Sequence, residues 1–262
     1  MTRSLLLVAL AVTVTACGSG APAEPLAVAP APEAVREGLT GAALDSLFVR
    51  GERAYSHGDW ADASVEFERF MLEAAAGDPR LSRARFYVAE SRLAQGEQLT
   101  AAREFRRISD ETPNDPLAAE ALLRVGDAYA ELWRRPELDP SYGQTAIATY
   151  QELLNRYPGT DEARRAEARV ADLQNQFAFK QYRAALYYLR LKAYDSAILY
   201  LKDLVATYPQ SEVAPDALLD LVAAYRRLGY QEDVLETCGY LRRFHPTAAG
   251  LDAACPAAAS AG

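Results

Sequence analysis

The chain has 262 residues, of which 50% are hydrophobic and 24% are charged, and its formal net charge is −8. This is the composition of a globular protein, and the acidic balance argues against a nucleic-acid-binding protein, which normally presents a basic face. Two histidines and three cysteines leave little material for a Cys/His metal site.

The first element along the chain has the pattern of an export signal. Arg3 precedes an apolar run over residues 5–14, which is too short to span a bilayer core of about 30 Å. The run leads into a Val-Thr-Ala-Cys sequence at residues 14–17, which resembles the lipobox of bacterial lipoproteins. The resemblance implies a signal peptide over residues 1–16 and a lipid-bearing Cys17. The alternative is an ordinary secretory signal that contains a cysteine and is cleaved elsewhere.

The lipobox resemblance also implies how the chain is anchored. It implies a diacylglyceryl group and an amide-linked acyl chain on Cys17, and no other cofactor. More than one chain is needed because a single acyl chain binds membranes only marginally. Gly18 and Ser19 follow without an acidic retention signal, which in bacteria that use this rule implies sorting to the outer membrane.

Residues 17–41 are predicted to combine the lipid-bearing cysteine with a disordered tether. Four prolines alternate with alanines after Cys17, which favours an extended, unfolded spacer. At the other end of the chain, residues 247–262 are rich in alanine and are predicted to be a disordered tail.

Residues 42–246 contain an internal repeat. A small or β-branched residue, a packing residue four positions later and then a proline recur five times. In the last four copies the first residue and the proline are twelve positions apart. The copies are Ala63/Phe67/Pro79, Ala101/Phe105/Pro113, Ala146/Tyr150/Pro158, Ala197/Leu201/Pro209 and Val234/Cys238/Pro246.

Each copy predicts a helical hairpin. Small residues at both helices let the two axes approach closely, the packing residue fills the neighbouring gap, and the proline ends the second helix. The small residues of the first helices are Gly51, Ala89, Gly126 and Ala185, with Val222 in the fifth copy. The predicted fold is therefore all-α, an α-solenoid of five hairpins, and solenoids mostly bind other proteins.

Two intervals break the repeat. Between Gly126 and Ala146 there are eight residues more than in the equivalent intervals, which predicts a Pro-bounded loop over residues 133–142. Between Pro158 and Ala197 there are seventeen extra residues without Gly or Pro after Gly159. Good helix formers fill this stretch, so residues 161–191 are predicted to form one long helix. Three tyrosines near its end are predicted to be core residues of the fourth repeat, namely Tyr187, Tyr188 and Tyr194.

Two cysteines remain once Cys17 carries lipid. Cys238 occupies a packing position of the last repeat, where a buried thiol behaves as a small hydrophobe, and Cys255 lies in the alanine-rich tail. An oxidising periplasm permits a disulfide between them, but we expect no obligatory bridge.

The hairpins resemble tetratricopeptide (TPR) repeats, and the two irregular intervals resemble the BamD family of outer-membrane assembly lipoproteins. The resemblance covers about residues 44–246, and the long loop with the elongated helix is its more specific part. Val222 and Val234 of the fifth repeat depart from the small pair and need a wider helix crossing, which suits a terminal repeat. The stretches that carry the resemblance are residues 138–146, 157–160, 185–197 and 208–211.

This resemblance implies a non-catalytic adaptor on the periplasmic side of the outer membrane. It implies that the C-terminal repeats dock on the periplasmic domains of the barrel-assembly protein. It also implies that the N-terminal repeats receive unfolded outer-membrane proteins.

Candidate peptide-binding residues follow from the TPR register, in which the first helix of each repeat lines a groove. Phe48, Tyr55 and Phe86 are predicted to form an apolar pocket for an aromatic end of a client strand. Arg83 is placed to meet a carboxylate. The alternative is that these aromatic residues pack between repeats.

Candidate docking residues lie in the inserted loop and the last repeat. Trp133 beside Arg134 is predicted to be a half-exposed Trp–Arg cluster of the kind found at interface hot spots, with loop packing as the alternative. Arg226 and Arg227 are either the rim of the docking surface or a solvated face.

Two rival functions are considered. A TPR coordinator of the cell envelope, associated with peptidoglycan or the Tol–Pal system, usually carries an N-terminal coiled coil, which the four prolines of residues 18–41 exclude. A glycan-cleaving lipoprotein needs paired acidic residues in a cleft, and the sequence singles out no such pair.

Overall fold

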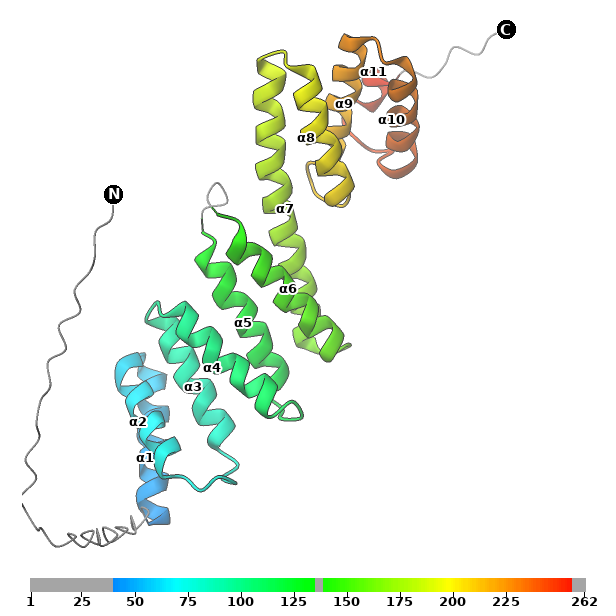
Figure 1. The fold of residues 1–262 in the computed structure, drawn as a ribbon. Helices are drawn as coiled ribbons and strands as arrows, with labels where there is room; N and C mark the ends of the chain where they lie inside the picture. The colour runs from blue at the N-terminus through cyan, green and yellow to red at the C-terminus, as the bar shows by residue number, and fades with distance from the viewer. Residues whose placement is uncertain (1–39, 135–138, 256–262) are drawn as a thin grey trace, which may run out of the picture. The chain divides into compact units, whose positions relative to one another are not determined.

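The computed structural model describes residues 40–134 and 139–255. All of the described residues belong to one compact unit, and every regular element among them is an α-helix (Figure 1). The predicted signal peptide, Cys17 and the tether lie outside the described residues. The helices are α1 (Gly41–His57), α2 (Trp60–Glu73), α3 (Leu81–Ala94), α4 (Gln98–Glu111), α5 (Ala118–Leu132), α6 (Ser141–Arg156), α7 (Asp161–Arg190), α8 (Tyr194–Thr207), α9 (Ala214–Leu228), α10 (Gln231–Phe244) and α11 (Leu251–Ala254).

The first ten helices form five hairpins, which confirms the predicted solenoid of TPR-type repeats. Each helix packs on the next one along the chain, and the first helix of a repeat also touches the repeat before it, as α3 contacts α1. Glycines in the left-handed conformation close two of the turns, Gly58 after α1 and Gly229 after α9, where a side chain would be strained. In the parts of the chain that the structure describes, no helix has both the length and the apolarity needed to cross a bilayer.

Close helix packing depends on the small residues, as the repeat predicted. A Cβ on Gly51 would lie 2.8 Å from the ring of Phe67, and one on Gly126 would overlap the ring of Tyr150. Both rings are completely buried. The aromatic residue of one helix therefore fills the space that the missing side chain leaves on the other.

The long helix α7 joins two parts of the core. Thr160 caps it by accepting a hydrogen bond from the backbone of Ala163, and no proline or glycine interrupts its 30 residues. Its first half, up to Phe177, packs in the same cluster as residues of α5 and α6. Its second half, from Ala178, packs with residues of α8, α9 and α10. The predicted long helix is thus confirmed.

The prediction that Tyr187, Tyr188 and Tyr194 form the core of the fourth repeat is wrong. Tyr187 is 52% exposed and Tyr188 and Tyr194 are only half-buried. The helical period places Tyr182, Ala185 and Leu189 on the packed side of α7, which turns Tyr187 away from it.

We expected no obligatory bridge between the two C-terminal cysteines, but the structure contains one. Cys238 and Cys255 form a disulfide with a Cα–Cα distance of 5.6 Å. The structure also differs from the expected tail, because residues 246–255 continue into α11 and Leu251 and Cys255 are buried. These two positions are one helical turn apart, so both side chains reach the end of the core.

Candidate functional site

A groove follows one side of α7. It consists of two clefts, of about 350 and 720 Å³, that meet at Gln176, and we call it the α7 groove. The smaller cleft is lined by Arg124, Asp127, Ala130, Glu131, Arg134, Tyr150, Arg169, Asp172, Leu173 and Gln176. The larger one is lined by Asn175, Gln176, Phe179, Lys180, Arg183, Ala184, Leu186, Arg190, Glu212 and Val213.

The smaller cleft is built on a connected polar network. The Asp127 carboxylate accepts a hydrogen bond from the Tyr150 hydroxyl at 2.7 Å and one from Arg124 at 3.2 Å, and it pairs with Arg169 at 3.5 Å. Arg124 in turn holds Glu90 on α3 through two nitrogens. The network therefore ties together α3, α5, α6 and α7.

Burial and charge set the protonation of this network. Burial, together with the neighbouring Asp127 carboxylate, raises the pKa of Tyr150 above its ordinary value. Burial on its own would lower the pKa of Arg124, but the bonds to Glu90 outweigh it and the pKa is raised. Both groups keep their protons at neutral pH, so they hold the wall of the cleft in place and have no poised acid or base chemistry.

The larger cleft has an apolar floor and charged edges. Phe179 is 53% exposed in it, and Leu186 lies two turns further along α7. Arg183 and Arg190 line the same side, and the far edge is fixed where Asn175 accepts a hydrogen bond from the backbone of Glu212 at 3.0 Å. This arrangement can hold an apolar side chain while offering donors to carbonyls or carboxylates.

A second polar pair joins α7 to α9 behind the larger cleft. Tyr182 donates a hydrogen bond to Asp220 at 2.8 Å. Burial, with the nearby Asp216 carboxylate, raises the pKa of Asp220 above its ordinary value although the Tyr182 bond opposes this. Within residues 40–134 and 139–255, no group of three or more His, Cys, Asp or Glu side chains is arranged to hold a metal ion.

The predicted aromatic pocket is not assembled. Phe48 is buried between α1, α2 and α3, with its ring 5.4 Å from that of Phe67. Tyr55 packs beside this cluster, whereas Phe86 belongs to the next one, 5.2 Å from the Phe105 ring. Phe86 thus packs in a different cluster from Phe48 and Tyr55, so the three rings do not line one pocket.

Arg83 is the accessible member of the predicted peptide-binding set. Its guanidinium lies 3.6 Å from the Glu52 carboxylate and 5.7 Å from the centre of the Tyr87 ring. Tyr87 also packs against Tyr55, with the ring centres 4.6 Å apart. Arg83 and these tyrosines therefore form a small surface patch on α1 and α3.

Trp133 is not half-exposed as predicted. Only 3% of it is accessible, and its ring stacks on Phe177 of α7 with a centroid distance of 4.0 Å. The ring fits because Gly143 has no side chain, since a Cβ there would lie 2.5 Å from the Trp133 ring. Trp133 thus anchors α7, whereas the neighbouring Arg134 is exposed and lines the smaller cleft.

The two arginines of α9 have different surroundings. Arg226 donates a hydrogen bond to the backbone carbonyl of Ala254, beyond α10, and Arg227 is exposed. Arg226 is therefore committed to the C-terminal segment, and Arg227 is the member of the pair that stays available to a partner.

Sequence reasoning missed the larger cleft. The signal was Phe179, which follows Phe177 and Ala178 directly and so cannot share their packed side on one helix. An aromatic residue out of register with the packed side of a long helix indicates an exposed apolar surface.

Comparison with known proteins places these features in a family. The family model described as YfiO, outer membrane lipoprotein, matches residues 42–238. Outer membrane protein assembly factor BamD of Vibrio cholerae is 34% identical over 112 residues, which span 43% of this chain and 46% of that protein. Its namesake in Xylella fastidiosa is 28% identical over 212 residues, which span 75% of this chain and 70% of that protein.

Alignment with one of the solved TPR structures is distant. The TPR2AB domain of yeast Sti1, in its pHSP90 complex, aligns with a TM-score of 0.43 and 16% identity over 79% of each chain. A likeness of this size adds nothing to the hairpins already described.

Proposed function

The chain belongs to the YfiO family of outer membrane lipoproteins, and we propose that it is a non-enzymatic adaptor in the assembly of outer-membrane β-barrel proteins. Its relatives in Vibrio cholerae and Xylella fastidiosa are named as outer membrane protein assembly factors. In this proposal the C-terminal repeats dock on the barrel-assembly protein, with Arg227 at the rim, and unfolded outer-membrane proteins bind the repeats as extended segments. Arg134 and the Arg83 patch are further contact points.

The observation that carries the proposal is the open, apolar-floored α7 groove. Residues 176–190 of α7 extend for about 21 Å, because an α-helix rises 1.5 Å per residue. An extended peptide rises about 3.3 Å per residue, so this length accommodates about six residues of a client. A groove of this length suits a short stretch of extended strand.

The chemistry of the groove fits the composition of a membrane strand. Strands of outer-membrane barrels alternate apolar and polar residues. Extended alongside α7, such a segment directs its apolar side chains to Phe179 and Leu186 and its backbone carbonyls towards Arg183 and Arg190. The polar network at Asp127 keeps the wall of the adjoining cleft rigid. Binding of a client therefore does not lose free energy to ordering that wall.

The groove is tested with a peptide of alternating apolar and polar residues, titrated against the full chain. Phe179→Ala is expected to weaken binding by about tenfold, the effect of removing a central aromatic contact. Phe244→Ala on α10 is the matched control, since this phenylalanine is 54% exposed and lies outside the groove. Equal affinities for the two variants, or an unchanged affinity for Phe179→Ala, would contradict the groove as the client site.

The adaptor role has its own test. The lipid-anchored protein is solubilised from outer membranes under mild conditions and its bound proteins are identified by mass spectrometry. Recovery of a barrel-assembly protein supports the proposal, and its absence overturns it. Arg227→Glu is expected to reduce this recovery, whereas Arg53→Glu on α1 serves as a distant surface control.

A further inference from the structure

The last hairpin lacks a following repeat that would cover it. Inside the stack, the first helix of each repeat packs against the hairpin before it, as α3 does against α1 and α2. After α10 no such helix of full length follows in the described residues. The buried cluster of this hairpin, which includes Leu241, would then have no helix of a following repeat over it. Repeat proteins need a cap at this point.

The short helix α11 takes the position of the missing repeat. It contacts both α9 and α10, as the first helix of a sixth repeat would. Leu251 and Cys255 are 7% and 3% exposed and belong to the same buried cluster as Val222 and Leu241. A single helical turn does not persist by itself in water, so this contact depends on additional attachments.

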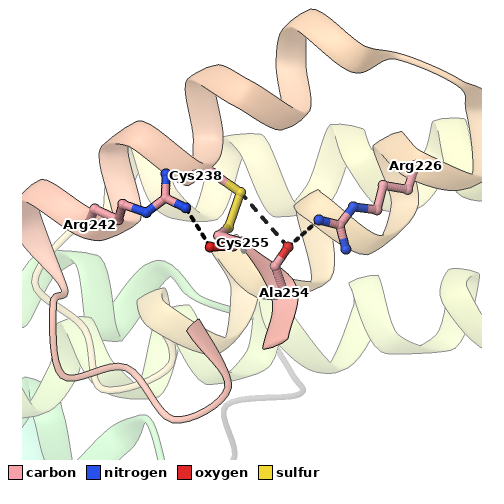
Figure 2. The surroundings of a disulfide bond; sticks show 5 residues. All are labelled: Arg226, Cys238, Arg242, Ala254 and Cys255. Atoms are coloured by element: carbon pink, nitrogen blue, oxygen red, sulfur yellow. Dashed lines mark hydrogen bonds between the residues drawn. A yellow bond between two sulfur atoms is a disulfide. The ribbon is translucent and has the colours of Figure 1, made fainter. Parts of the chain in front are cut away.

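Three attachments hold the segment, and Figure 2 shows them together. Cys255 is bonded to Cys238 of α10. Arg226 of α9 donates a hydrogen bond to the carbonyl of Ala254, and Arg242 of α10 donates one to the carbonyl of Cys255. The end of α11 is therefore tied to both helices of the last hairpin, and the carbonyls of Ala254 and Cys255 each accept a hydrogen bond.

We propose that residues 246–255 form a covalent cap, and that Cys238 and Cys255 are the substrate of a thiol–disulfide oxidoreductase that closes this cap after export. The chain belongs to a family of outer membrane lipoproteins, whose members leave the reducing cytoplasm. Disulfides form and persist in the bacterial periplasm and are rare in the cytosol. The proposal does not depend on whether clients bind the α7 groove.

The exchange balances in two steps. The Cys255 thiolate attacks the disulfide of the oxidant, forms a mixed disulfide and releases one oxidant thiolate. The Cys238 thiolate then attacks the Cys255 sulfur, which forms the Cys238–Cys255 bond, breaks the mixed disulfide and releases the second oxidant thiolate. The protein loses two electrons and two protons, and the oxidant leaves as a dithiol. Cys255 reacts first because it lies on the segment that opens, whereas Cys238 lies within α10.

The redox state is measured on the full chain isolated with its thiols alkylated at lysis. Mass spectrometry is expected to show the Cys238–Cys255 pair bonded. Cells that lack the periplasmic thiol oxidant are expected to yield the same protein with both thiols alkylated. A reduced pair in the wild-type cells, or a fully bonded pair without the oxidant, would overturn the proposal.

The capping role is measured by amide hydrogen exchange with and without a phosphine reductant. Reduction is expected to speed exchange in α10 and α11 at least tenfold and to leave α1 to α4 unchanged. The corresponding melting transition is expected to fall by about 5–10 °C. Cys255→Ser keeps the segment and loses only the bond, so it should match the reduced protein and ignore the reductant. Unchanged exchange in α10 after reduction would show that the segment is no cap.

Two adjacent arginines provide a matched pair. Arg226→Gln removes the donor to Ala254, whereas Arg227→Gln changes an exposed neighbour on the same helix. If the guanidinium holds the cap closed, Arg226→Gln is reduced by dithiothreitol at least threefold faster than wild type and Arg227→Gln at the wild-type rate. Equal rates of reduction for both variants would show that Arg226 does not hold the cap closed.

Discussion

The first and the last hairpin are held together by different chemistry. Between α1 and α2, Phe48 packs against Phe67 and Phe70 with ring distances of 5.4 and 5.1 Å, and the Arg80 guanidinium lies 4.9 Å from the Phe70 ring. Between α9 and α10 the equivalent places carry Leu219, Cys238 and Leu241 instead of aromatic rings, and a disulfide holds the following segment in place. The end without rings at these places has a covalent attachment, whereas the end with three packed phenylalanines is held by aromatic packing.

The largest loss of stability is expected when the central ring of the first hairpin is removed. Phe67 is completely buried and its ring covers Gly51, so no neighbour can refill the space. Phe67→Ala is expected to cost about 3–5 kcal/mol in the free energy of unfolding, measured by urea denaturation. The exposed Phe244→Ala is the control and should change it by less than about 0.5 kcal/mol. A comparably small effect at Phe67 would show that packing does not secure this hairpin.

Breaking the covalent attachment of the last hairpin is expected to cost less. The disulfide closes a sequence separation of 17 residues, for which chain entropy gives about 3 kcal/mol. Cys255→Ser is expected to lose this amount, confined to α9, α10 and α11 as seen by hydrogen exchange. The contrast with the first hairpin fails if the loss is spread over α1 to α4 as well.

Between the two ends, Tyr150 tests a polar attachment. Tyr150→Phe keeps the ring that fills the space at Gly126 but removes the hydroxyl donor to Asp127. The expected loss is about 1–2 kcal/mol because a buried carboxylate loses one of its donors. Tyr142→Phe on the exposed side of α6 is the matched control. Thermal melting is measured for both variants. Equal melting temperatures would show that the hydrogen bond from Tyr150 to Asp127 does not stabilise the fold.

The smallest expected effect is a difference in pH dependence between the middle and the C-terminal part of the molecule. Burial opposes ionisation of Glu152, but its bonds with Arg106 at 2.6 Å and Arg156 at 2.7 Å outweigh it and lower the pKa. Its folded pKa lies below its unfolded value of about 4.5, so its stabilisation is present above that pH and is lost on further acidification.

Asp220 has the opposite sign, because burial raises its folded pKa above the unfolded value of 3.8. The folded state retains this proton to higher pH, so stability falls as pH rises through that window and the cost persists at neutral pH. In a plot of the free energy of unfolding against pH, Asp220→Asn should therefore remove a decrease just above pH 3.8. Glu152→Gln should remove an increase below pH 4.5. Denaturation midpoints at successive pH values measure both slopes, and identical slopes for the two variants contradict the assignment.

The sequence accounts for the helices better than for the site. Repeated spacing of small residues and prolines predicted the five hairpins, and the lack of Gly and Pro after Gly159 predicted α7. The orientation of Trp133 escaped prediction, because it depends on Gly143 of α6 and Phe177 of α7 meeting across the loop. The α7 groove escaped for the same reason, since its walls come from helices far apart in the chain.

By itself, the sequence determined the local features: where helices begin and end, which positions are small, and which family the chain resembles. Only the tertiary structure decided that Phe48 and Phe86 fill different clusters, that Trp133 is buried and that Cys255 reaches Cys238. The physical reason is one of range. Helix formation depends on residues a few positions apart, which a sequence displays directly. Burial of a side chain and pairing of two cysteines depend on which helix surfaces meet after the hairpins have stacked. Close packing of side chains from distant parts of the chain decides which surfaces meet.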